Sequence, residues 1–238
     1  MNDMPATELI GATIEVSPKQ VIDGKAPAGL FPAGTKVYLT DIGTHGISDL
    51  VAATRQLSDA GYDPVPHMPA RRIASEFELQ RRIGGFTQEG GVTDMLLIAG
   101  EAPMQMGPYD SVMTMLNMGH FDHYGVKSMG VAGHPEGNSA YPAGTLEAVL
   151  SEKADFAGRT NADMRIVTQF GFDAAATIRW AERLRISGIY LPVHVGVAGP
   201  AKITTLLKYA MMCGVGNSIE FLKKRGGALA ALATSYSP

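Results

Sequence analysis

The sequence predicts an α/β protein folded as a (β/α)₈ barrel of the TIM type. Seven short apolar, β-prone runs recur along the chain, and helical patterns lie between them. Such alternation implies parallel strands joined by right-handed crossovers. The repeating units span roughly 25 to 35 residues, and seven of them exceed what a compact doubly wound sheet normally needs, so a barrel is favoured. Polar, glycine-rich turns follow two of the strands, at 133–138 and 168–173, where repeated β/α folds gather their chemistry.

Strands are predicted wherever a short run of apolar or β-branched residues is bounded by turn residues. The run Asp-Met-Leu-Leu-Ile at 94–98 is the strongest of them. The predicted strands are residues 12–16, 36–40, 63–67, 94–98, 126–132, 164–167 and 189–193.

Helices are predicted where apolar residues recur at helical spacing between these strands. Ser48 and Asp173 are predicted N-caps, and Trp180 and Leu184 are expected on the inner face of the helix that Asp173 begins. The predicted helices are residues 48–61, 70–84, 109–118, 145–156, 173–188 and 217–232, and a further one begins at 199–200 with proline in its first turn.

Barrel closure is the weak point of this fold prediction. No eighth strand follows the last predicted helix, although closing a barrel requires one. Either a C-terminal tail is absent from this chain or the barrel stays open between its first and seventh strands. With no internal repeat and no low-complexity linker, residues 1–238 are expected to form a single barrel domain.

Composition indicates a soluble globular protein and not a disordered one. Of the 238 residues, 45% are hydrophobic and 18% charged, and the net charge of −3 is spread along the chain. We therefore expect no nucleic-acid partner and no membrane partner. No apolar run reaches the roughly 18 residues that span a bilayer, the N-terminus lacks the basic segment of a secretory signal, and the single cysteine, Cys213, suits a reducing cytoplasm.

Two candidate residues belong to the first and third predicted strands. Glu15 stands among β-branched apolar residues. It either points into the barrel mouth, where burial would let it hold the proton that a general acid needs, or forms a structural ion pair with a buried base. His67 could bind a phosphate or the edge of a flavin ring, although a lone histidine is more often a satisfied structural group.

Three later strand ends carry further candidates. Gly100 permits close approach of a ligand, and Glu101 is placed either to bind a polar ring or to face solvent. The turn Gly-His-Pro-Glu-Gly-Asn at 133–138 holds donors and acceptors, but no third ligand has the spacing of a metal site, so no metal is expected. Gln169 stands beside two phenylalanines, so its amide could read the edge of a heterocycle on which the rings stack, or could simply hold a loop.

The ordered set of strand-end segments resembles the methylenetetrahydrofolate reductase family, which is a (β/α)₈ barrel. The Pro-Glu-Gly and Thr-Gln-Phe-x-Phe-Asp segments are the specific ones. The matching segments are Ile-Glu-Val-Ser-Pro at 14–18, Pro-His at 66–67, Leu-Ile-Ala-Gly-Glu at 97–101, Gly-His-Pro-Glu-Gly at 133–137 and Ile-Val-Thr-Gln-Phe-Gly-Phe-Asp at 166–173.

This resemblance implies an oxidoreductase of one-carbon metabolism and methionine biosynthesis that reduces 5,10-methylenetetrahydrofolate to 5-methyltetrahydrofolate. It implies NADH or NADPH as reductant, FAD as hydride carrier, and Glu15 as the general acid that opens the imidazolidine ring. Glu101, Gln169 and Phe172 would bind the folate. The flavin contacts that the resemblance implies are His67, Gly100, Asp110, His134, Glu136 and Asn138.

The sequence departs from the family pattern beside the flavin. The fourth-strand turn reads Ala-Gly-Glu at 99–101 where the family has Arg-Gly-Asp, which removes a cation that helps bind the FAD diphosphate. One charge-assisted contact is worth about 1.5–3 kcal/mol. A flavin-free reductase with direct hydride transfer therefore stays open, as do a folate-dependent methyltransferase or demethylase, a non-catalytic folate-binding subunit, and assembly into homo-oligomers.

Overall fold

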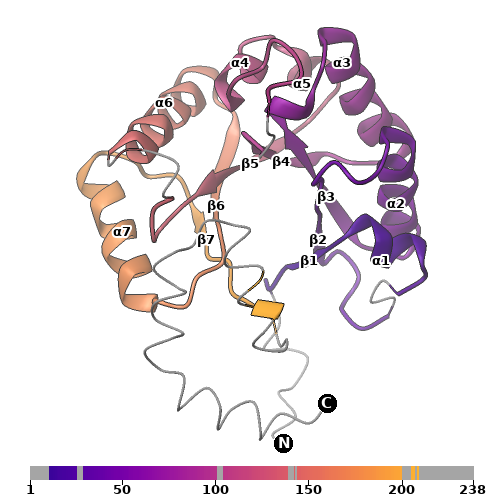
Figure 1. Ribbon diagram of the computed structural model, residues 1–238, viewed down its shortest axis with the longest axis horizontal. Coiled ribbons are helices and arrows are strands. Elements are labelled where there is room, and N and C mark those ends of the chain that lie inside the picture. The colour runs from indigo at the N-terminus through magenta and orange to yellow at the C-terminus, as the bar shows by residue number, and fades with distance from the viewer. Residues whose placement is uncertain are drawn as a thin grey trace, which may run out of the picture. The chain divides into compact units, whose positions relative to one another are not determined.

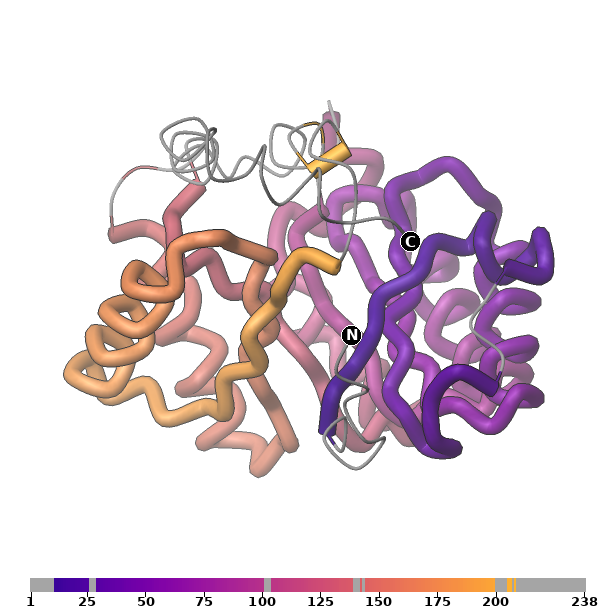
Figure 2. Tube along the Cα trace, turned by 90° about the horizontal axis from the view of Figure 1, so that it is seen from below, coloured from indigo at the N-terminus to yellow at the C-terminus, as the bar shows by residue number. Residues whose placement is uncertain are grey.

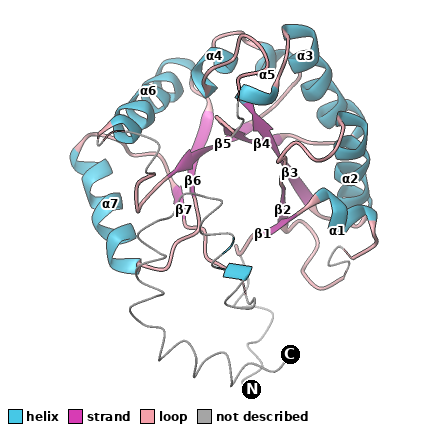
Figure 3. Cartoon of the chain, viewed as in Figure 1, coloured by secondary structure: helices cyan, strands magenta, loops and turns pink. Residues whose placement is uncertain are grey.

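The computed structural model describes residues 11–25, 29–100, 104–138, 142, 144–199, 205, 206 and 208. Its strands follow one another in chain order, β1 to β7, in one seven-stranded sheet, and helices alternate with the strands along the chain (Figure 3). The chain groups into two compact units, Met1–Gly130 and Val131–Pro238, and the boundary falls inside β5. The predicted α/β class is therefore confirmed, while the single domain over 1–238 stays a prediction.

The first unit is built on four strands and the helices between them. Parallel registers join β1 to β2, β2 to β3 and β3 to β4. Figure 1 shows α1, α2 and α3 along one side of these strands, and Figure 2 shows β1, in indigo, running beside β2. The elements are β1 (Ile14–Val16), α1 (Pro18–Ile22), β2 (Lys36–Leu39), α2 (Ile47–Asp59), β3 (Asp63–Pro69), η2 (Ala70–Arg72), α3 (Glu76–Gly84), the π-helical turn η3 (Gly85–Glu89), β4 (Asp94–Ile98), α4 (Val112–Leu116) and α5 (His120–His123).

Apolar strand residues and a buried ion pair stabilise this unit. Val37, Val65 and Leu97 are fully buried between the strands and their helices. Arg82 of α3 reaches Asp41, just after β2, at 2.7 Å, and both side chains are buried. Because a buried charge is costly without a partner, this pair fixes α3 against the end of β2.

The second unit contains the end of β5 (Ser128–Gly133), followed by α6 (Thr145–Thr160), β6 (Asp163–Thr168), α7 (Ala174–Ile186) and β7 (Val193–His194). β6 and β7 pair in parallel, with Ile166 opposite Val193. Trp180 and Leu184 of α7 are each only 1% exposed, so the predicted inner face of this helix is confirmed. Gly133 lies under that face, where an added Cβ would come within 2.8 Å of the Trp180 ring.

Helix starts are where the sequence predictions differ most from the structure. The predicted N-cap Ser48 is wrong, because α2 begins at Ile47 behind Gly46. The helix expected from residue 70 is a short 3₁₀ turn followed by α3 at Glu76, since the Ser75 side chain caps α3 by accepting from the Glu78 amide. The predicted cap Asp173 is confirmed: its carboxylate accepts from the Ala176 amide at 3.0 Å.

The seventh strand lies later than expected. It covers Val193–His194 and not 189–193. The Ile189 amide donates to the Leu184 carbonyl and so belongs to the end of α7, and Pro192 has no amide hydrogen to donate to a neighbouring strand. No eighth strand is found in the described part of the chain. The helix predicted to begin at 199–200 is described only at residues 205, 206 and 208, which are helical, and the helix predicted over 217–232 lies outside that part. Within that same part, no helix is both long and apolar enough to cross a membrane.

Candidate functional site

Glu15, Tyr38 and His67 lie on one face of the first three strands. Glu15 of β1 stands opposite Tyr38 of β2, and Tyr38 stands opposite Val65 of β3. His67 follows Val65 by two residues, so its side chain emerges on the same face of the sheet. The Tyr38 and His67 rings meet edge to face, with their centroids 6.3 Å apart.

The structure brings together two residues that the resemblance gave separate roles. His67 Nε2 lies 3.5 Å from Glu15 Oε2. The His67 side chain is 11% exposed and that of Glu15 is 60% exposed. Of the two alternatives for Glu15, burial is therefore wrong, and the other, a carboxylate beside a buried base, is what the structure shows.

The imidazole of this pair has capacity for another contact. Among the described residues, the buried Nε2 atom of His67 has no hydrogen-bond partner, because 3.5 Å to Glu15 is an ion-pair distance and no more. A buried polar atom without a partner costs about 1–3 kcal/mol, so it is a position where a polar ligand atom or water would be accepted. The pair places side by side a carboxyl group and an imidazole, two groups that general acid–base catalysis often uses.

The other candidates of the first unit differ in their surroundings. Gly100 has φ +78°, and an added Cβ would lie 2.6 Å from Cβ of Pro69, so the fold itself requires glycine here. Asp110 is exposed, and its backbone carbonyl accepts a hydrogen bond of 3.1 Å from Nε of Arg71. Glu101, predicted to bind folate, lies outside the described residues.

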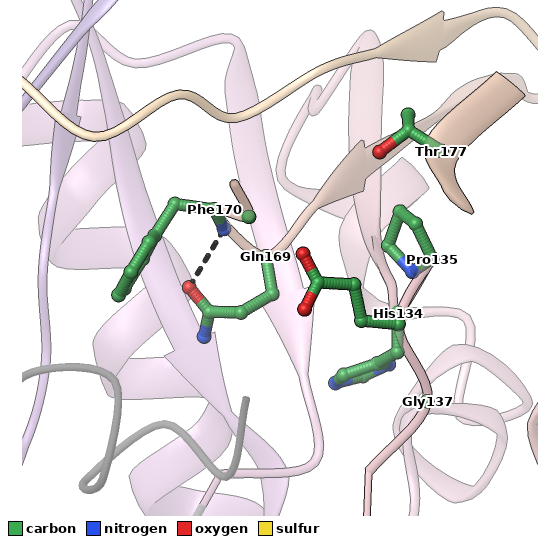
Figure 4. Close-up of a pocket in the computed structure, with 8 residues that line it drawn as sticks. His134, Pro135, Gly137, Gln169, Phe170 and Thr177 are labelled. Atoms are coloured by element: carbon green, nitrogen blue, oxygen red, sulfur yellow. Dashed lines mark hydrogen bonds between the residues drawn. The ribbon is translucent and has the colours of Figure 1, made fainter. Parts of the chain in front are cut away.

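In the second unit, the turns after β5 and β6 enclose a small pocket. Figure 4 shows Gln169 and Phe170 on one side of it, and His134, Pro135 and Thr177 on the other. The sequence candidates His134, Glu136 and Gln169 therefore come together as expected of neighbouring strand ends. The lining residues are His134, Pro135, Glu136, Gly137, Gln169, Phe170, Gly171 and Thr177.

Gln169 is held at this pocket by its own backbone. Its backbone amide donates to the Gly133 carbonyl at 2.8 Å, which extends the pairing of β5 and β6 by one residue. Its side-chain Oε1 accepts from the Phe170 amide at 3.0 Å, the dashed line in Figure 4. The Phe170 and Phe172 rings pack edge to face at 6.0 Å. A half-buried amide beside two aromatic rings suits a flat heterocycle with donors and acceptors on its edge.

Glu136 contacts the same turn through its carboxylate. Its Oε1 accepts from the Phe172 amide at 3.1 Å and from the Asp173 amide at 3.3 Å. The family resemblance implied that Glu136 contacts a cofactor, and nothing in the spacing of residues indicated that its partners would be backbone amides of the next turn. Asn138 is half-buried at the end of the same segment.

A buried lysine lies near His134 and was missed by the sequence analysis. Lys153 is only 6% exposed on α6, and burial lowers its pKa to about 8. Burial also lowers the pKa of His134, and the Lys153 charge lowers it further, so both effects favour the neutral imidazole. The missed signal is that Lys153 occupies the buried stripe of α6 together with Leu150 and Phe156.

The described residues do not fit the full flavin site that the resemblance implies. Gly100 is required by packing against Pro69, and the Glu136 carboxylate is bonded to the backbone. The predicted contacts also contain two acids, Asp110 and Glu136, but no lysine or arginine for a diphosphate. In the part of the chain that is described, no group of three or more His, Cys, Asp or Glu side chains is placed to hold a metal ion.

Comparison with known proteins adds a modest likeness. No protein-family model matches the chain. The chain is 26% identical over 161 residues to a protein of Pectobacterium carotovorum subsp. carotovorum named 5,10-methylenetetrahydrofolate reductase, which covers 65% of this chain and 50% of that protein. The chain thus spans about half the length of the curated relative it matches. The likeness supports a link to the family that the strand-end motifs resemble.

Proposed function

We propose that this protein is a folate-linked oxidoreductase that reduces 5,10-methylenetetrahydrofolate to 5-methyltetrahydrofolate with NADH or NADPH. The observation that carries the proposal is the Glu15–His67 pair, a carboxyl group and a buried imidazole 3.5 Å apart on neighbouring strands. General acid catalysis needs a group that can transfer a proton to the substrate, and a carboxyl group beside an imidazole has the chemistry to relay one. The likeness to a named methylenetetrahydrofolate reductase supports the choice of substrate.

In the proposed reaction, Glu15 donates a proton to the imidazolidine ring nitrogen as its bond to the methylene carbon breaks. This leaves an iminium cation on the pterin nitrogen. A hydride from the nicotinamide then forms the third C–H bond of the methyl group, and the nicotinamide leaves oxidised. After each turnover Glu15 would regain its proton from solvent, with His67 as the relay.

The substrate residues are proposed for the second unit. The Gln169 amide would read the polar edge of the pterin, and Phe172 would pack on its ring. No residue is assigned to the reductant, and no step is assigned to a flavin. An eight-stranded barrel forming one domain, a cytoplasmic location and homo-oligomers belong to the same proposal.

The test is NADH or NADPH oxidation by the purified full chain, followed with and without methylenetetrahydrofolate. The proposal predicts oxidation only when the folate is present, and predicts that Glu15→Gln abolishes it while folate binding is retained. Flavin absorbance of the purified protein would show a bound hydride carrier, and a colourless active protein would show direct transfer. Binding of methyltetrahydrofolate without nicotinamide oxidation would refute the reductase and select the methyl-transferring or non-catalytic alternative.

A further inference from the structure

We infer that Glu136 is a positioning residue that fixes the turn carrying Gln169 and Phe172, and not a cofactor contact. The inference rests on the proposed function, because it assigns that turn to the folate. Its basis is that one carboxylate oxygen accepts from two successive amides, those of Phe172 and Asp173, at 3.1 and 3.3 Å. Consecutive amides at the entry of a helix form a concave anion site, and here a side chain from the preceding strand end fills it.

The turn leaves room for this carboxylate because residue 171 is a glycine. At Gly171 an added Cβ would lie 2.5 Å from Glu136 Oε1 and 3.3 Å from its Cδ, so the close approach requires glycine. Directly after the two bonded amides, Asp173 caps α7 through the Ala176 amide. The carboxylate therefore ties the entry of α7 to the end of β5.

The same turn is held from its other side by the segment after β7. The Gly196 amide donates to Thr168 Oγ1 at 2.9 Å, and Gly171 forms a parallel bridge with Val197. Gln169 lies between these two attachments, with its backbone bonded to Gly133. Removing the Glu136 attachment would free the Phe172 side of the turn while leaving the Thr168 side in place, so the expected effect is a loosened substrate loop in a folded protein.

The test compares Glu136→Ala and Glu136→Gln, with Glu182→Ala, an exposed carboxylate on α7, as matched control. We expect Glu136→Ala to weaken binding of 5-methyltetrahydrofolate at least tenfold in calorimetry and to raise hydrogen exchange at the Phe172 and Asp173 amides at least tenfold. Glu136→Gln keeps an acceptor oxygen and should restore affinity to within about threefold. The Michaelis constant for the nicotinamide should not change, and the control should behave as wild type.

Two results would overturn the inference. Unchanged amide exchange in Glu136→Ala would show that the carboxylate does not hold the turn. Equal loss of folate affinity in Glu136→Ala and Glu136→Gln, with exchange raised only in the alanine variant, would show that the charge contacts a ligand directly. If the wild type binds no folate, the proposed function falls, and the exchange measurement alone decides whether Glu136 positions the turn.

Discussion

Replacing Lys153 with methionine should make the protein more stable at neutral pH, although it removes a charged residue. Lys153 is 6% exposed on the inward face of α6, beside Leu150 and Phe156. Burial penalises its charged form and lowers its pKa from 10.5 to about 8. Methionine has similar length, fills the same space and needs no proton.

The magnitude follows from the two pKa values of Lys153. A lowering from 10.5 to about 8 corresponds to about 3 kcal/mol of destabilisation at pH 7. Between these pH values the unfolded chain holds the proton and the folded chain does not. The free energy of unfolding of the wild type therefore rises with pH through this window, and the full penalty is present below pH 8.

Urea unfolding of both proteins at several pH values between 7 and 10.5 provides the assay. We expect Lys153→Met to be more stable by up to about 3 kcal/mol at pH 7, with the difference shrinking as the pH approaches 10.5. The variant should also raise the pKa of His134 in an NMR titration, though not to its ordinary value, because burial is the larger cause of its lowering. A stability difference that is the same at every pH would refute this reasoning.

The remaining predictions concern packing, a buried ion pair and the substrate. Gly133→Ala would place a methyl carbon 2.5 Å from Ile166, and should lower the free energy of unfolding by about 1–3 kcal/mol in urea titrations; a neutral result would show that the sheet relaxes freely. Asp41→Ala leaves the guanidinium of Arg82 buried with one partner fewer, and should cost about 3 kcal/mol by the same measurement, whereas a loss below about 1 kcal/mol would mean that water replaces the carboxylate. Gln169→Ala should weaken binding of 5-methyltetrahydrofolate in calorimetry without lowering stability, and unchanged affinity would remove Gln169 from the pterin site.

The strands were largely predictable because their signal is local. Residues 94–98 form β4 with the predicted bounds, and the runs at 63–67 and 164–167 became the longer strands β3 and β6. The signals that were overlooked are local as well. Ser75 and Glu78 have the spacing of a capping box, and the Ser-Pro-Lys-Gln run at 17–20 begins α1 with a capping box of its own.

The candidate site was predictable only in part, because its contacts join residues far apart in the sequence. Glu15 and His67 were both selected as candidates, but their meeting depends on the register of three strands. Glu136 was selected as well, yet its partners are backbone amides 36 and 37 residues later, which no residue type reveals. Lys153 could have been noticed, since a lysine within an apolar helical stripe either has a partner for its charge or a shifted pKa.

The central claim is that Glu15 delivers the proton on which folate reduction depends. The most direct measurement is the amount of 5-methyltetrahydrofolate formed from methylenetetrahydrofolate and NADH or NADPH, for the wild type and for Glu15→Gln, under conditions where both bind folate. The proposed mechanism predicts product from the wild type and at least a hundredfold slower formation by the variant. Formation by Glu15→Gln within a few-fold of the wild type would contradict it.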